Sequence, residues 1–309
     1  MIAGKRVRDG RRKGAGDAVQ QGRNHQYARS CRAIALTLAF SCAAFSAAAE
    51  DFELTGAIGL DSRGSYRGTL GDGFRPASHG YLELVRGDFL AGVFANPVKI
   101  QGENGALVLS YASWKPSVGK IDLEVGARRY WFPGSSDFIY DFDRDGVADH
   151  AGRKGLFEAQ AGVRRKFTGG RVHLRAFYTP DGFGETGPAW YFNGEGRLNI
   201  AYGFEARGAV GVSRFSNPLY NEDYVDYRAG LYKTALGFDM YVRYSDTAGL
   251  SGPDNRAVIF GVEREFTLAS SARGERRRFE KIRNDWIVDK SLIGFGAIAG
   301  PQSYWPAGQ

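Results

Sequence analysis

Cysteine is missing from residues 50–309 of this 309-residue chain, because both of its cysteines, Cys31 and Cys42, lie near the N-terminus. This absence excludes disulfide bonds, thiol catalysis and cysteine-bound metals from most of the protein. Long apolar runs are missing as well. Beyond residue 49, no stretch approaches the roughly 18 consecutive apolar residues that a membrane-spanning helix needs.

An excess of charge is also missing once the N-terminal segment is set aside. Residues 1–49 contain nine Lys and Arg against two Asp, a net charge of +7 that equals the net charge of the whole chain. Residues 50–309 are therefore neutral. The basic isoelectric point gives no support for nucleic-acid binding, and we expect no nucleic-acid partner.

The N-terminal segment has the features of a secretory signal peptide. A basic region precedes an apolar stretch, residues 33–46, which is too short to span a membrane as a helix. Ala47-Ala48-Ala49 then supplies the small residues that signal peptidase requires. We predict that residues 1–49 are a signal peptide and that the mature chain begins at residue 50.

The mature chain consists of short segments in which apolar and polar residues alternate. Residues 52–61 and 237–246 each alternate for about ten positions, the length of a tilted transmembrane β-strand. The pattern predicts an all-β fold, a transmembrane antiparallel β-barrel of about twelve strands. The predicted strands are 52–62, 77–86, 88–96, 105–114, 120–132, 155–167, 171–180, 188–197, 202–214, 223–233, 236–246 and 256–266.

The connections between these strands alternate in length. Those after the second, fourth, sixth, eighth and tenth strands are short, whereas the other connections are longer: 62–76, 97–104, 133–154, 181–187, 215–222 and 247–255. A barrel inserted from the periplasm has short turns inside and long loops outside. We therefore expect periplasmic termini, and a barrel over residues 50–266.

Residues 267–309 continue beyond the predicted last strand without any alternation, and include the basic run Arg276-Arg277-Arg278. The sequence favours a C-terminal extension that is disordered, and the alternative is a periplasmic appendage that contacts a partner.

Several of these segments resemble the TorF-like porins, a family of proteobacterial outer-membrane proteins. Residues 61–68, Asp-Ser-Arg-Gly-Ser-Tyr-Arg-Gly, are similar to the family's Ser-Asp-Tyr-x-Phe-Arg-Gly segment after the first strand. The resemblance extends to residues 130–133, to Glu158 and to the closing segment 258–266, which ends on Phe266. It implies a pore and no catalytic residues. The closing segment is similar to the C-terminal signal that the outer-membrane assembly machinery reads.

The alternation also predicts which charged residues lie inside the barrel. Facing charges in a narrow lumen create a transverse field and set ion selectivity. In the alternative arrangement, charges on neighbouring strands pair and fill the lumen, and a twelve-stranded barrel lies between the filled and open size classes. The residues that we expect to line the constriction are Arg128, Glu158, Arg164, Arg175, Arg207, Asp226, Arg228 and Arg243.

One long loop contains an acidic motif that is similar to the first part of an EF-hand. Its candidate metal ligands are Asp141, Asp143, Asp145, Val147 (through its carbonyl) and Asp149. Alternate carboxylates around a glycine, here Gly146, supply the hard oxygens and the sharp turn that Ca²⁺ requires. However, Gly152 stands where a bidentate Glu normally completes the loop. A structural Ca²⁺ site and a solvated acidic turn both remain open, and no cofactor is required.

Together these patterns predict an outer-membrane channel of a Gram-negative bacterium. Small polar or ionic solutes would pass by passive diffusion, and oligomers are possible. The alternative is a non-conducting barrel with an anchoring or adhesive role at the surface, in contact with membrane lipid and lipopolysaccharide. An enzyme is disfavoured, because the mature chain has only His79, His150 and His173. Of these, His173 shows no Ser or Asn at a partnering spacing on its own strand, and His150 is expected to be a solvated residue at the end of the acidic loop.

Overall fold

A computed structural model describes residues 52–67, 69–70, 76–100, 103–134, 138–140, 150–152, 155–218, 221–250 and 256–271. The chain divides into two units, residues 1–49 and 50–309, and all described residues lie in the second. The predicted signal peptide and almost all of the C-terminal extension lie outside them.

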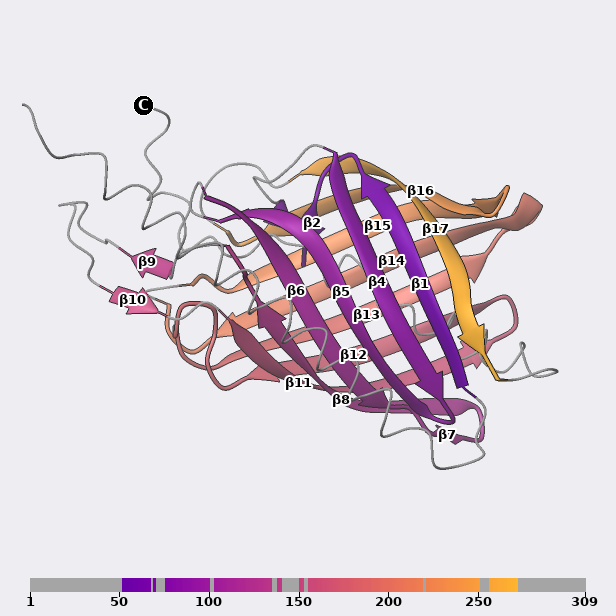
Figure 1. The fold of residues 1–309 in the computed structure, drawn as a ribbon, viewed down its shortest axis with the longest axis horizontal. Helices are drawn as coiled ribbons and strands as arrows, with labels where there is room; N and C mark the ends of the chain where they lie inside the picture. Colours follow the sequence, from indigo (N-terminus) through magenta and orange to yellow (C-terminus); the bar gives the residue numbers. More distant parts are fainter. Residues whose placement is uncertain are drawn as a thin grey trace, which may run out of the picture. The chain divides into compact units, whose positions relative to one another are not determined.

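The described residues form one large antiparallel sheet that closes into a barrel of twelve strands (Figure 1). Alternating side chains explain why these segments form strands, since one face of each strand is apolar and the other polar. The long strands are β1 (Phe52–Asp61), β4 (Ala77–Arg86), β5 (Phe89–Ile100), β6 (Glu103–Trp114), β8 (Ile121–Trp131), β11 (Leu156–Phe167), β12 (Gly170–Thr179), β13 (Ala189–Asn199), β14 (Phe204–Phe215), β15 (Tyr224–Ala235), β16 (Phe238–Ala248) and β17 (Ala257–Ser270).

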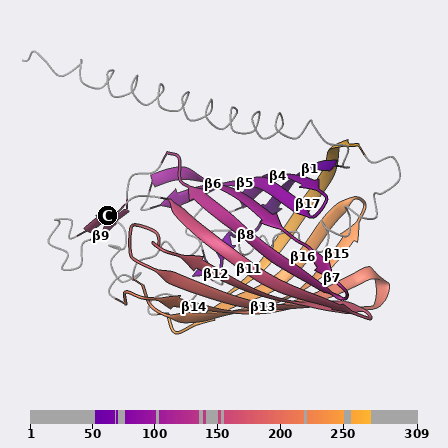
Figure 2. The same ribbon diagram turned by 90° about the horizontal axis from the view of Figure 1, so that it is seen from below.

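The sheet closes because each long strand pairs with two neighbours. In chain order each pairs with the next, and β1 completes the ring by pairing with β17. The closing pair runs from Glu53 opposite Ser270 to Asp61 opposite Gly261. Figure 2 shows the same wall from below. The predicted fold, an antiparallel barrel of twelve strands, is confirmed.

The short connections lie where the sequence predicted them. Residues 87–88, 168–169 and 236–237 are two-residue turns, and Gly87 and Gly237 have φ angles of 55° and 76°. Such left-handed conformations are what a tight hairpin between twisted strands requires. The turn 115–120 contains the two-residue strand β7 (Ser117–Val118), and the connection after β13 contains a single 3₁₀ turn, η1 (Ala201–Gly203).

Two predicted boundaries were wrong. The connection 97–104 is not a long loop, because β5 and β6 continue until only residues 101–102 separate them. Pro97 fits within β5 because β5 extends there beyond β4, which last pairs with it at Ala95. The last strand runs past Phe266 to Ser270, where it pairs with the start of β1.

Within the connection 62–76, residues 65–67 and 69–70 lie inside the barrel, contrary to our expectation of a loop on the outside. The connection contains two short strands, β2 (Ser65–Tyr66) and β3 (Thr69–Leu70), which pair as a small hairpin (β2 in Figure 1). Ser65 and Thr69 are only 2% and 3% exposed. Contacts between this hairpin and the opposite wall explain its position, as described below. Such long-range contacts leave no signal in the local sequence pattern.

The two faces of the wall differ as the alternation predicted. Large apolar side chains point outward and stay exposed, such as Ile58, Phe89, Val125 and Phe260, at 58–64%. Such a surface is typical of a barrel wall that faces lipid. The inward face contains the buried residues, most of the buried charge among them. None of the described segments is a helix long and apolar enough to cross a membrane.

Candidate functional site

The lumen contains all eight residues predicted to line a constriction. Each lies on the inward face of its strand, and they come from six strands between β8 and β16. Arg207 has a side chain that is 30% exposed, whereas the others are at most 7% exposed: Arg128, Glu158, Arg164, Arg175, Asp226, Arg228 and Arg243. The structure brings these residues into one interior, and their role in conduction stays a prediction.

Between β8 and β11, charges on adjacent strands pair with each other. Arg164 lies opposite Asp122 in the register, and its Nε donates to the Asp122 carboxylate at 3.0 Å. The Ser117 hydroxyl donates to the same carboxylate at 2.5 Å. Gln160 donates its amide to Glu124 at 2.8 Å. At these positions neighbouring side chains fill and neutralise the wall, as the closed-lumen alternative expected.

A second network of charges covers β12, β13 and β14. Glu195 accepts hydrogen bonds from Arg197 and, at 3.3 Å, from Arg175. Glu205 accepts one from Arg207. Because guanidinium groups outnumber carboxylates among these residues, this part of the wall is basic.

An acidic sector lies on β17, β1 and β4, and sequence reasoning missed it. The inward positions of these three strands contain no Lys or Arg, and their carboxylates are Glu53, Asp61, Glu83, Glu263 and Glu265. The signal was present, since Glu263 and Glu265 alternate with the outward Val262 and Phe266. The alternation that assigned the basic residues to the inward face also assigns these carboxylates to it.

Tyrosine hydroxyls hold three of these carboxylates in place, and one of them is Asp61, which accepts from Tyr241 on β16. Tyr111 on β6 donates to Glu83 at 2.5 Å, and Tyr81 on β4 donates to Glu265 at 2.6 Å. Neutral donors orient a carboxylate without cancelling its charge. The acidic sector thus contains oriented carboxylates on the inward face of the wall.

The order of strands in the ring places the acidic sector across from β12 and β13, two of the three strands of the basic part of the wall. β1 and β12 are six strands apart in a closed ring of twelve, and the acidic strands β17, β1 and β4 therefore face β11, β12 and β13. On β12 the inward positions include Arg171 and Arg175. Opposite charges on facing walls of a narrow, low-dielectric lumen produce a field across it.

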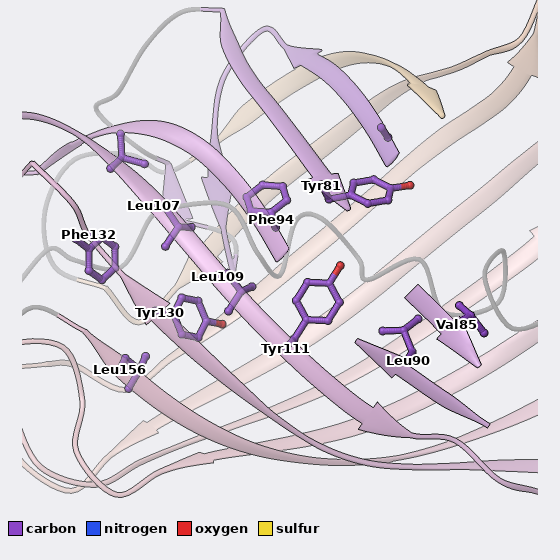
Figure 3. Packing of buried hydrophobic residues seen from close by; sticks show 12 residues of the cluster. Tyr81, Val85, Leu90, Phe94, Leu107, Leu109, Tyr111, Tyr130, Phe132 and Leu156 are labelled. Carbon is purple, nitrogen blue, oxygen red and sulfur yellow. The ribbon is translucent and has the colours of Figure 1, made fainter. Parts of the chain in front are cut away.

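One part of the inner wall is apolar rather than charged. A buried cluster extends from β1 to β11 on the inward face and includes Phe94, Leu107, Leu109 and Phe132 (Figure 3). Phe183, from the connection between β12 and β13, contacts the Phe132 ring edge-on with their centroids 5.5 Å apart. This packing narrows the lumen on that side and leaves the charged strands to line what remains.

A small, open hollow lies on the inner wall along β13 to β16. Small residues, Ala209 and Gly230, make room for it. Its charged and aromatic lining consists of Glu195, Arg197, Arg207, Arg228, Tyr232 and Arg243. Its guanidinium groups already have partners in the wall, since Arg197 pairs with Glu195, Arg207 with Glu205 and Arg228 with Asp226.

Arg128 is buried beside an acidic residue that already has other partners. Its guanidinium lies 4.6 Å from the centre of the Phe177 ring, and its Nε and Nη1 find no acceptor among the described residues. Glu158, opposite Arg128 in the register, is instead bound by Arg67 and by the Tyr130 hydroxyl. Arg128 is therefore a buried positive charge whose facing carboxylate is bound by other groups.

The predicted calcium ligands lie outside the described residues. Asp141, Asp143, Asp145, Val147 and Asp149 belong to the segment between β9 (Phe138–Tyr140) and β10 (His150–Gly152), which pair with each other. The possible Ca²⁺ site stays a prediction.

Solved structures of outer-membrane channels show a weak similarity to this chain. The KdgM porin has 10% sequence identity, with 70% of this chain and 99% of that chain covered and a TM-score of 0.45. An outer membrane channel from Pseudomonas putida F1 has 11% identity, with 70% and 95% covered and a TM-score of 0.42. At these identities and scores the function of the neighbours does not transfer, and the architecture rests on the strand pairing itself.

The search of curated proteins found no match. The resemblance to TorF-like porins is not tested by these comparisons and stays a prediction. A family model described as a bacterial protein of unknown function (Gcw_chp) matches residues 45–269, which include the entire described barrel except its last two residues, and the chain belongs to that family.

Proposed function

We propose that this protein is an outer-membrane channel of a Gram-negative bacterium, through which small polar or ionic solutes diffuse passively. The observation that carries the proposal is the opposition of an acidic and a basic sector across the lumen of a closed barrel. A transverse field orients solutes and water within a narrow passage and discriminates between ions.

The outer face supports the location in a membrane. Its large exposed apolar side chains, such as Val125 and Phe260, would be unfavourable in water and are favourable against lipid acyl chains. Lipid, lipopolysaccharide and the outer-membrane assembly machinery are the partners that this location implies. Export by the signal peptide belongs to the same proposal.

A non-enzymatic role fits the positions of the two histidines whose side chains are described. A lipid-modifying group would need to reach the lipid from the outer face. His79 and His173 both point inward, where His79 lies 2.9 Å from Glu263 and His173 lies 3.7 Å from Glu124. We therefore do not propose catalysis.

A specific observation favours the non-conducting alternative. Most charged residues of the lumen are under 10% exposed, and ion pairs such as Arg164 with Asp122 occupy interior space. A lumen filled in this way would leave the protein with an anchoring or adhesive role.

Single-channel recording distinguishes the two functions. The protein is extracted from membranes in its native form and added to a planar lipid bilayer under a salt gradient. Discrete conductance steps with a reversal potential different from zero are expected. A folded protein that inserts but remains electrically silent would contradict the channel and favour the anchoring role.

A further inference from the structure

The β2–β3 hairpin is part of the interior and is held against one side of the barrel by its first residues. The Ser62 amide donates to the Phe260 carbonyl of β17 at 2.8 Å, and the Phe260 amide donates to the Ser62 hydroxyl at 3.0 Å. Further along, the Arg243 guanidinium of β16 donates to the Ser65 hydroxyl at 3.0 Å. The base of the hairpin is therefore attached to the wall formed by β16 and β17.

The tip of the hairpin contacts a different part of the wall. Arg67 lies at the tip, and its Nη2 is 2.5 Å from the Glu158 carboxylate of β11. Its guanidinium lies 4.2 Å from the centre of the Tyr191 ring of β13 and 5.4 Å from that of Phe177 of β12. Arg67 is thus held by an ion pair and by stacking on two aromatic rings.

These two attachments lie on opposite sides of the lumen. In the ring of twelve strands, β17 and β11 are six strands apart. A segment attached to β17 at its base and to β11 at its tip must cross the interior. The hairpin and Arg67 therefore occupy part of the path that a solute would take.

We propose that the β2–β3 hairpin forms the constriction of the lumen, and that Arg67 sets the size and charge of the solutes that pass. This inference rests on the proposed channel function. The Arg67 side chain occupies the cross-section, and its positive charge, next to that of Arg128 at the Phe177 ring, favours anions at the narrowest point. Removing the side chain should widen the passage and shift its preference toward cations.

The first test compares Arg67→Ala with the wild-type protein in a planar bilayer. We expect single-channel conductance to rise by about two-fold or more and the reversal potential to shift toward cations. Neutral polyethylene glycols that wild type excludes should enter the variant and lower its conductance. Arg214→Ala is the matched control, because the Arg214 side chain is 61% exposed and pairs with Asp223 away from the lumen.

A second set of variants separates the charge of Arg67 from its shape. Arg67→Lys keeps the charge and loses the planar stacking, so we expect altered conductance with the wild-type ion preference. Arg67→Cys, with Cys31 and Cys42 replaced by Ser, allows chemical modification at this one position. A positively charged thiol reagent should restore the wild-type ion preference, and a negatively charged one should increase the preference for cations.

The outcomes separate this inference from the proposed function. If wild type conducts and Arg67→Ala has the same conductance and reversal potential, the constriction lies elsewhere and the inference is overturned. If wild type is silent and Arg67→Ala conducts, the hairpin is the closure and the inference stands. If the folded wild type and all Arg67 variants are silent, both proposals fail.

Discussion

At the scale of single residues, the interior combines strain with compensating contacts. Arg67 has a φ of 45°, a left-handed conformation that destabilises a non-glycine residue by about 1–2 kcal/mol. The ion pair with Glu158 and the stacking on Tyr191 offset this strain. Strained residues persist where surrounding contacts fix them, and they concentrate at functional sites.

Glycine makes room for a second set of interior contacts. The Tyr191 hydroxyl lies against Gly211 and donates to Asp226 at 3.0 Å. A Cβ atom added at Gly211 would lie 2.2 Å from that hydroxyl. Gly211 is thus required by the close approach of a ring from the adjacent strand, an arrangement also used in designed barrels.

Lys115 provides a prediction on pH dependence. It lies in the turn after β6, outside the spanning strands, with Nζ 3.8 Å from Glu124. Burial lowers the pKa of Lys115 from 10.5 to about 8, although Glu124 opposes the shift. Because the folded pKa is below the unfolded one, the unfolded chain binds more protons between these values, and stability should rise with pH across this window. The lumen loses one positive charge as pH rises through about 8.

We therefore expect the reversal potential to move toward cations between pH 7 and pH 9, on either side of the pKa of about 8 of Lys115. Lys115→Met should already show the more cation-preferring value at neutral pH and lose this step. Lys120→Met, in the same turn and exposed, serves as the control. A pH step that persists unchanged in Lys115→Met would assign it to another group.

At the scale of elements, the sequence predicted all twelve strands, each boundary falling within four residues of the structure. Period-two alternation is a local signal, and it also assigned the inward and outward faces. The hairpin could not be predicted in this way. Its position depends on Arg67 contacting Glu158, 91 residues further along the chain. No local pattern contains that information.

The strands also predict how substitutions on the outer face affect stability. Val125 lies near the middle of β8 and is 58% exposed, whereas Ile121 begins the same strand and is 41% exposed. Val125→Arg should lower the free energy of unfolding in lipid by about 2–4 kcal/mol, and Ile121→Arg by about 0–1 kcal/mol, because the penalty is greatest at the bilayer midplane. Urea titrations of the protein in vesicles measure both, and equal effects would contradict a lipid-facing wall.

At the scale of the whole molecule, the separation of charge across the barrel emerges only from the closed ring. Each strand displays its inward charges in the sequence, but which strands face each other depends on closure between β1 and β17. The basic residues were therefore predicted individually and a transverse field was expected, while the acidic sector and its place opposite the basic residues were not predicted.

The charge sectors give opposite predictions for ion preference. Glu263→Gln combined with Glu265→Gln should shift the reversal potential toward anions, because it removes negative charge from the acidic sector. Arg171→Gln combined with Arg175→Gln should shift it toward cations. Arg264→Gln, on the outward face of β17, is the control. Shifts of the same sign in both double variants would contradict a transverse field.

The pairing of β1 with β17 also determines the order of assembly. The Phe52 amide donates to the Ser271 hydroxyl, a contact between residues 219 positions apart, so the ring closes only after the last strand is available. Neighbouring hairpins form earlier because their contacts are local. The β2–β3 hairpin directly follows β1 and contacts β11, β13 and β16. The hairpin can make these contacts only once β11, β13 and β16 have formed, so the segment proposed to narrow the lumen docks after much of the wall is in place.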